Sequence, residues 1–259
     1  MKSLFAASLT GLALLSGAAL AADLPPAAPA YKAPAVVAPS YSWSGCYIQG
    51  GGGYGMWNQD SSTELTTGLV PLSVRTTFGG RGWYGQAGAG CDYQATPNIL
   101  VGAFGDYSFM NLTGQYMDPL TGFVGQEKES SSWAVGGRIG WIITPGLMGY
   151  TNGGWTQAHF NQINFGSLIN GAPLGLDIAA TTYNGWFLGG GTETSLAGFF
   201  GLPLPPGLFL RSEYRFSTFA AKDLPIVFSA TGAPSGLSDH VNKYVQTIGT
   251  ELIYKFNWH

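Results

Sequence analysis

The stretch SWAVGGRIGWII, residues 132–143, alternates bulky apolar residues with small or charged ones. Because successive side chains of a β-strand point to opposite faces, this stretch would form a strand with two unlike faces. One face would carry Trp133, Val135, Ile139, Trp141 and Ile143. The other would carry Ser132, Ala134, Gly136, Arg138 and Gly140. An apolar outer face with a polar or small inner face is typical of a strand in a membrane β-barrel.

Other segments repeat this alternation along the chain. Residues 99–111, 208–218 and 243–256 each place apolar and aromatic side chains on one face and charged side chains on the other. A fifth segment is ambiguous, because Tyr150 and Trp155 fall on opposite faces. In total we predict eight strands, near Trp43–Met56, Gly82–Tyr93, Ile99–Asn111, Ser132–Ile143, Leu147–Phe160, Thr182–Thr194, Leu208–Thr218 and Lys243–Phe256.

The connections between these strands are predicted to be alternately long and short. The short ones are residues 94–98, 144–146 and 195–207, and the long ones are residues 57–81, 112–131, 161–181 and 219–242. Short periplasmic turns alternating with long extracellular loops are typical of an outer-membrane barrel whose two termini both lie in the periplasm.

Composition supports the same fold class. Charged residues make up 10% of the chain, against roughly 25% in an ordinary soluble domain. Beyond the N-terminus no apolar run approaches the roughly 20 residues of a membrane helix. A closed barrel is the other structure that satisfies its backbone hydrogen bonds in lipid. We therefore predict an all-β protein, an eight-stranded antiparallel up-and-down transmembrane β-barrel.

The first residues predict export. Lys2 precedes an apolar core at residues 4–15, and residues 19–21 (ALA) match a signal-peptidase site. Prolines among alanines then indicate an extended linker. The predicted organisation is a signal peptide at 1–21, a Pro/Ala-rich periplasmic linker at 22–42 and an outer-membrane β-barrel at 43–259.

Charged residues of both signs fall on the inner faces of the predicted strands. Since a buried charge without a partner costs several kcal/mol, these residues would pair with one another. They are either a salt-bridged plug that holds the barrel closed or the selectivity lining of a conducting pore. We favour the plug, because eight strands enclose little more than side chains. The predicted network comprises Asp92, Asp106, Arg138, Glu193, Arg211, Glu213, Arg215, Glu251 and Lys255.

Cys46 and Cys91 are the two cysteines of the chain, and both are predicted to face outward near the periplasmic ends of adjacent strands. In the oxidising periplasm, neighbouring strands could bring them within disulfide range. The alternative is two thiols that behave as small apolar residues. Both interpretations are open from the sequence.

Several short segments, spread in a common order over nearly the whole mature chain, match a known family. They are residues 22–25 (ADLP), 43–48 (WSGCYI), 137–141 (GRIGW), 150–155 (YTNGGW), 185–193 (GWFLGGGTE) and 213–216 (EYRF). With these segments the chain resembles the small outer-membrane barrel proteins of alphaproteobacteria, the outer-membrane immunogenic protein family, also described as porins. The resemblance implies an eight-stranded barrel with periplasmic termini.

One feature departs from the family pattern. Family members end on an aromatic residue of the last strand, which the barrel-assembly machinery reads. This chain continues past Phe256 with Asn257, Trp258 and His259. Trp258 has the same strand parity as Phe256, so the signal could be shifted by two residues, and the extra residues put the efficiency of assembly in doubt.

The sequence favours a structural or surface role in the outer membrane, with a weakly conducting small-solute porin as the alternative. An enzyme is not expected, because no nucleophile motif such as G-x-S-x-G is present. We expect no cofactor and no metal. The mature chain has 10 basic against 14 acidic residues once Lys2 is removed, which argues against nucleic acid. The expected partners are outer-membrane lipid and lipopolysaccharide, and the barrel-assembly machinery during biogenesis.

Overall fold

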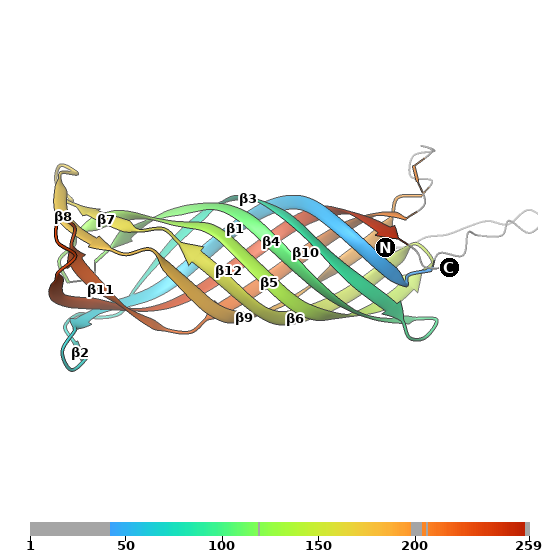
Figure 1. Cartoon of the computed structure of the whole chain (residues 1–259), viewed down its shortest axis with the longest axis horizontal. Coiled ribbons are helices and arrows are strands. Elements are labelled where there is room, and N and C mark those ends of the chain that lie inside the picture. Colours follow the sequence, from blue (N-terminus) through green and yellow to red (C-terminus); the bar gives the residue numbers. More distant parts are fainter. Residues whose placement is uncertain (1–41, 119, 198–203, 206, 257–259) are drawn as a thin grey trace, which may run out of the picture. The chain divides into compact units, whose positions relative to one another are not determined.

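The computed structural model describes residues 42–118, 120–197, 204–205 and 207–256, which form one ring of long antiparallel strands (Figure 1). The predicted signal peptide, residues 22–41 of the linker and residues 257–259 lie outside the described residues. The first and last strands pair from Cys46 opposite Phe256 to Leu65 opposite Leu237 and so close the ring. The eight strands of the ring are β1 (Gly45–Leu65), β3 (Thr76–Gln94), β4 (Ile99–Met117), β5 (Val124–Thr144), β6 (Leu147–Phe160), β9 (Thr181–Ser195), β10 (Leu208–Phe219) and β12 (Pro234–Phe256).

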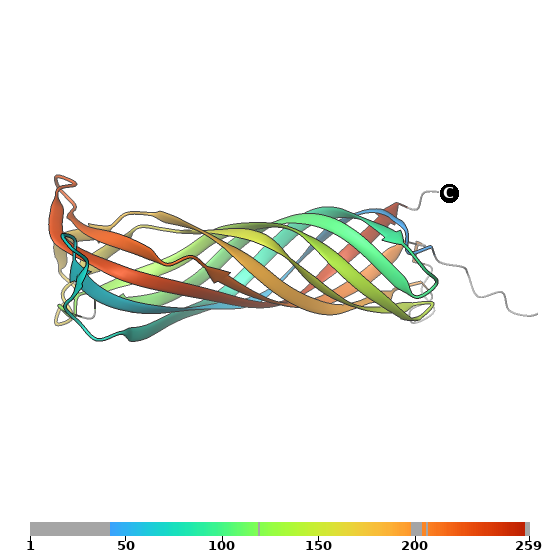
Figure 2. The ribbon, with the colours of Figure 1, turned by 90° about the horizontal axis from the view of Figure 1, so that it is seen from below.

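The predicted eight-stranded antiparallel barrel is confirmed. One end of the ring, which we call the turn end, carries the tight connections between β3 and β4 and between β5 and β6 (Figures 1 and 2). The opposite end, the loop end, carries four short strands. They are β2 (Val70–Pro71), β7 (Ile163–Gly166), β8 (Pro173–Ile178) and β11 (Lys222–Phe228).

Three of these short strands continue the ring. β7 follows β6, β11 follows β10, and β8 precedes β9, in each case with a break of two residues. At the loop end the strands pair in the order β5, β7, β8, β11, β12. The wall therefore keeps eight strands at the loop end, where β7, β8 and β11 take the places of β6, β9 and β10. A continuous wall leaves few unpaired backbone groups at the loop end.

The predicted long loops at 57–81, 112–131, 161–181 and 219–242 are wrong, because most of their residues lie in strands. β1 continues to Leu65 and β5 already begins at Val124. The apolar alternation that identified the strands stops at Met56, and the following residues are polar on both faces, as in NQDSST at 58–63. Backbone pairing continues where this side-chain pattern ends.

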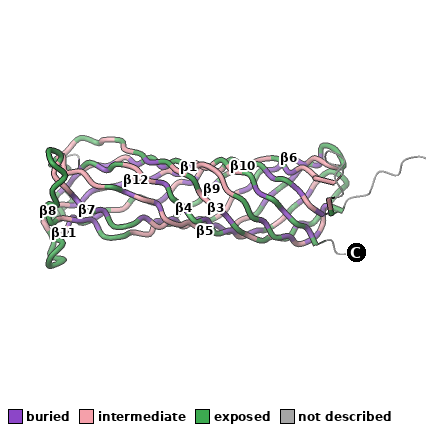
Figure 3. The backbone as a smooth tube through the Cα atoms, turned by 90° about the horizontal axis from the view of Figure 1, so that it is seen from above, coloured by how far each residue is buried: buried purple, intermediate pink, exposed green. Residues whose placement is uncertain are grey.

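The two faces of the wall differ as predicted. Buried and exposed residues alternate along each strand (Figure 3). Ile139 and Trp141 are 62% and 58% exposed on the outer face, whereas Arg138 is 3% exposed on the inner face. On β6, Tyr150 points inward and Trp155 outward, which settles the ambiguous strand. An exposed apolar band of this extent is typical of a surface that contacts lipid.

None of the described residues belongs to a helix long and apolar enough to cross a membrane.

The apolar band stops before the loop end. There several outward side chains are polar and bond to one another across strands: Trp133 Nε1 donates to Gln157 Oε1 at 3.0 Å, and Gln157 Nε2 donates to Asn184 Oδ1 at 2.7 Å. Thr77 Oγ1 likewise donates to Asp60 Oδ1 at 2.6 Å. Trp133 thus marks the border between an apolar and a polar outer surface, as aromatic girdles do in such barrels.

Inward glycines make room for bulky inward side chains of neighbouring strands. A Cβ atom on Gly80 would lie 2.5 Å from the Trp57 ring. One on Gly136 would lie 2.8 Å from Phe187 Cζ and 2.5 Å from the Gly153 carbonyl oxygen. Glycine weakens a strand by itself, and here it is required by the narrow lumen.

We expect Gly136→Val to destabilise the barrel by about 1–3 kcal/mol, because the added side chain would overpack the lumen against Phe187. Gly137→Val is the matched control, since a Cβ there faces outward and meets nothing nearer than 3.5 Å. The measurement is equilibrium unfolding of the refolded protein in denaturant. Equal stabilities of the two variants would contradict the steric role of Gly136.

Candidate functional site in the barrel lumen

All nine predicted lumen residues lie on the inner face of the wall, and most are buried. They form two groups at successive heights. The group nearer the turn end, which we call the turn-end cluster, comprises Asp92, Arg138, Glu193, Arg211, Glu251 and Lys255. The second group, the mid-barrel cluster, comprises Asp106, Glu213 and Arg215.

Glu193 is the centre of the turn-end cluster. Its Oε2 atom lies 2.9 Å from Arg138 Nη1 and 2.9 Å from Arg211 Nη2, and its Oε1 atom lies 2.8 Å from Lys255 Nζ. Its side chain has no solvent exposure. Three cations from β5, β10 and β12 therefore surround one carboxylate of β9, which ties together strands far apart in the sequence.

Asp92 and Glu251 balance the remaining positive charge. Arg138 donates to both Asp92 oxygens, at 2.9 and 2.5 Å, in the bidentate geometry that suits a guanidinium and a carboxylate. Lys255 Nζ lies 3.1 Å from Asp92 Oδ2. Arg211 Nη1 lies 3.5 Å from Glu251 Oε2. Each cation of the turn-end cluster thus contacts two carboxylates.

Two tyrosine rings cover the guanidinium groups. The Tyr47 ring centroid lies 4.9 Å from Arg138 Cζ and 5.1 Å from Arg211 Cζ, and the Tyr150 centroid lies 5.4 and 5.5 Å from the same atoms. Cation–π contacts of this kind strengthen when water is excluded. The aromatic faces therefore complete the surroundings of two cations whose edges are occupied by carboxylates.

The mid-barrel cluster has the same design on a smaller scale. Arg215 donates to both oxygens of Asp106, at 3.0 and 2.9 Å, and lies 2.8 Å from Glu213 Oε1. Tyr150 and Asn152 donate to Glu213 Oε2 at 2.7 and 2.8 Å. Asp106, Glu213 and Arg215 lie at predicted inward positions, whereas Tyr150 and Asn152 lie on β6, whose two faces the sequence left ambiguous.

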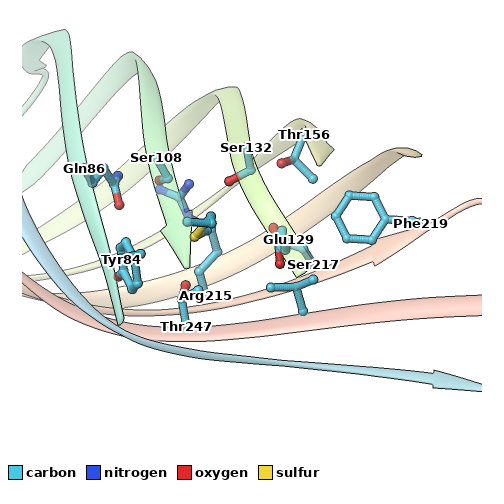
Figure 4. A pocket seen from close by; sticks show the side chains of 12 residues that line it. Tyr84, Gln86, Ser108, Glu129, Ser132, Thr156, Arg215, Ser217, Phe219 and Thr247 are labelled. Atoms are coloured by element: carbon cyan, nitrogen blue, oxygen red, sulfur yellow. The ribbon is translucent and has the colours of Figure 1, made fainter. Parts of the chain in front are cut away.

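Beside Arg215 the lumen contains a small cavity of about 20 Å³. Figure 4 shows the side chains that line it. This volume holds about one water molecule. Both carboxylate oxygens of Glu129, which lines the cavity, are buried without a hydrogen-bond partner. The other lining residues are Tyr84, Gln86, Ser108, Met110, Ser132, Thr156, Arg215, Ser217, Phe219, Val245 and Thr247.

A third set of inward charges was missed by the sequence analysis. Lys243 Nζ lies 2.5 Å from Glu127 Oε1, also donates to Gln59 Oε1, and lies 4.2 Å from the centroid of the Phe160 ring. Lys243 is the first residue of a predicted strand and shares the inward parity of Glu251, but the predicted network does not include it. Continuing the alternation backward from Ile253 would have assigned Lys243 and Asp239 to the lumen.

Asp239, on the inner face of the loop end, is fully buried. Burial raises the pKa of its carboxyl to about 7; the nearby Asp118 acts in the same direction, and the hydrogen bond that Tyr116 donates to Asp239 Oδ2 acts against it. Thr63 Oγ1 donates to Asp118 Oδ2 at 3.1 Å. The interior of the loop end therefore holds a carboxyl group that titrates near neutral pH.

Cys46 and Cys91 lie opposite each other in the register of β1 and β3, with an S–S distance of 1.97 Å. Both are at least partly exposed on the outer face near the turn end. The structure thus joins them in a disulfide, the first of the two alternatives that the sequence left open.

Ser132 and His159 lie on opposite faces of the wall and do not meet. Ser132 lines the lumen cavity, whereas His159 is on the outer face, where its Nδ1 atom lies 3.0 Å from Thr182 Oγ1. A nucleophile and its base must lie within hydrogen-bond reach, so these two residues form no catalytic pair.

Comparisons with known proteins point in one direction, although no family model matches the chain. The "31 kDa outer-membrane immunogenic protein" of Brucella melitensis is 28% identical over 268 residues, which cover 99% of this chain and all of that protein. The "25 kDa outer-membrane immunogenic protein" of Brucella abortus is 28% identical over 86% of this chain and 88% of its own length. The chain is a homologue of outer-membrane immunogenic proteins. The resemblance inferred from the short segments is thereby confirmed.

A solved structure supports the fold of this chain. The outer membrane protein OprG of Pseudomonas aeruginosa superposes with a TM-score of 0.52 over 82% of this chain and 97% of its own, at 14% identity. Together with the Brucella names, this likeness identifies an outer-membrane β-barrel protein.

We expect Glu193→Gln to lower the free energy of unfolding by about 3–5 kcal/mol, because it leaves buried cations without their shared carboxylate. Asp60→Asn is the control; its side chain lies on the outer face with Thr77 as partner and should cost less than about 1 kcal/mol. Denaturant unfolding of the refolded barrel measures both. If Glu193→Gln lowered the free energy of unfolding no more than Asp60→Asn does, the stabilising role of the turn-end cluster would be contradicted.

A second prediction concerns pH. The pKa of Asp239 is raised on folding, so the unfolded chain ionises from about pH 4 upward while the folded chain keeps its proton until about pH 7. Stability should therefore fall across this window. Asp239→Asn, which still accepts a hydrogen bond from Tyr116, should remove up to about 4 kcal/mol of that loss. Unfolding curves at several pH values test this, and parallel pH profiles of the two proteins would refute it.

Proposed function

We propose that this protein is a closed outer-membrane barrel with a structural and surface role, in which the charged lumen side chains act as a plug. The turn end would face the periplasm together with both termini, and the loop end would project from the cell. Short turns on the periplasmic side and longer connections outside are the usual arrangement in outer-membrane barrels.

The observation that carries this proposal is the pairing of the lumen charges. Glu193 alone contacts three buried cations, and Arg215 is held by Asp106 and Glu213. A solute or ion crossing this region would have to break several buried ion pairs. Removing one partner of such a pair costs roughly 3–5 kcal/mol, so an open lumen would be a rare state.

The alternative is a small-solute porin with a weakly conducting lumen. The cavity beside Glu129 favours it, since Glu129 has no hydrogen-bond partner and lines this cavity together with Arg215. Charged side chains that line a pore set its selectivity. Conduction would require the mid-barrel cluster to rearrange.

We further propose that the protein is not an enzyme. The acids and bases of the turn-end and mid-barrel clusters pair with one another, and the homologues bear names that describe outer-membrane immunogenic proteins. The proposed partners are the lipids of the outer membrane, lipopolysaccharide around the loop end, and the barrel-assembly machinery during biogenesis.

Single-channel recording in planar lipid bilayers distinguishes the two candidates. Refolded mature protein, checked by its heat-dependent gel shift, should insert and give no steady conductance steps, because the plug occupies the lumen. Flotation of the same protein with liposomes confirms insertion. Steady steps that depend on salt and change in Arg215→Gln would overturn the plug and establish the porin.

A further inference from the structure

Three polar side chains meet on the outer face of the loop end, where β1, β12 and β11 are neighbours. His240 on β12 lies opposite Asp223 on β11 and opposite Ser62 on β1. Glu64 on β1 lies two residues further toward the loop end, opposite Ser238. All three side chains lie beyond the apolar band; Asp223 is exposed and His240 is partly exposed, whereas Glu64 is buried.

The three side chains are close enough to share an ion. His240 Nδ1 lies 2.6 Å from Asp223 Oδ1, and one oxygen or nitrogen atom of each of Glu64, Asp223 and His240 lies within 4.8 Å of the others. Ligand atoms on a tetrahedral ion with bonds of about 2.0 Å are about 3.3 Å apart. Side-chain shifts of at most about 1.5 Å would therefore close the group around an ion.

Glu64 supplies independent evidence that the group is incomplete. It is 6% exposed, and its Oε1 atom is buried without a hydrogen-bond partner. The hydroxyl oxygen of Ser238, directly across from it, is also buried and unpartnered. A buried carboxylate oxygen without a donor is costly, which indicates that a positively charged ligand belongs here.

The nearest lysine in the sequence does not fill this role. Lys222, beside Asp223, donates from Nζ to the Thr182 carbonyl oxygen at 2.7 Å and lies near the Tyr183 ring, on the inner side of the wall. Lys222 therefore leaves the carboxylates of Glu64 and Asp223 available to a cation.

We propose that Glu64, Asp223 and His240 bind a divalent transition-metal ion of the Zn²⁺ type on the outer surface of the loop end. One imidazole and two carboxylates form a ligand set that suits such ions, whereas Mg²⁺ and Ca²⁺ prefer all-oxygen sites. Water would complete the coordination. This site is independent of the proposed lumen plug.

Cobalt absorption tests the site directly. The mature protein, refolded without a polyhistidine tag and stripped with a chelator, is titrated with Co²⁺, whose visible spectrum reports coordination by the protein. The expected result is one Co²⁺ per chain, displaced by Zn²⁺ and not by Mg²⁺. Absence of stoichiometric Co²⁺ binding would overturn the proposal.

Variants locate the ion. Glu64→Gln and His240→Gln should each weaken Co²⁺ binding roughly tenfold or more, since loss of a second-shell partner alone costs 10–100-fold. His159→Gln is the matched control, because His159 lies on the same outer surface and contacts Thr182 instead of a carboxylate. A heat-dependent gel shift confirms that each variant folds. If one ligand variant does not fold, Asp223→Asn is used in its place, because Asp223 is exposed. Unchanged binding in the ligand variants, or equal loss in the control, would refute the site.

Discussion

The rest of the structure depends on one constraint, the width of the lumen. A ring of eight strands satisfies every backbone hydrogen bond in lipid but encloses little more than side chains. An inward charge therefore has almost no water around it and must be neutralised by another side chain. Glu193 with its three cations is the fullest example. The inward glycines follow from the same constraint, because the large paired side chains need empty positions opposite them.

Side-chain alternation predicted the fold and most of the lumen, since Arg138 and Trp141 differ in parity and lie on opposite faces. It could not predict the length of the wall, because residues 58–63 are polar on both faces and resemble a loop. The contact between Lys243 and Glu127 joins residues 116 positions apart, and it depends on a strand register that one sequence does not reveal. The cluster of Glu64, Asp223 and His240 was missed for the same reason.

The two ends of the lumen are held together by different interactions. Near the turn end, ion pairs covered by tyrosines dominate, whereas near the loop end Trp57, Phe160 and Tyr183 surround the ammonium group of Lys243. Both arrangements keep charge away from water, and both fix strands that are distant in the sequence. Beyond the apolar band, charged side chains on the outer surface do not need to be paired in this way. A binding site can therefore form there without changes to the lumen.

The continuation of β1 from Asn58 to Leu65 also sets a height. Eight strand residues at about 3.3 Å each extend the wall by roughly 25 Å, measured along the strand, beyond the apolar band. In the proposed orientation, this rigid tube would stand among the sugars of lipopolysaccharide, with its sides shielded from large molecules. An antibody or a phage arriving from the medium would then meet the tips of the hairpins first, and changes in those few turn residues would alter recognition without disturbing the barrel.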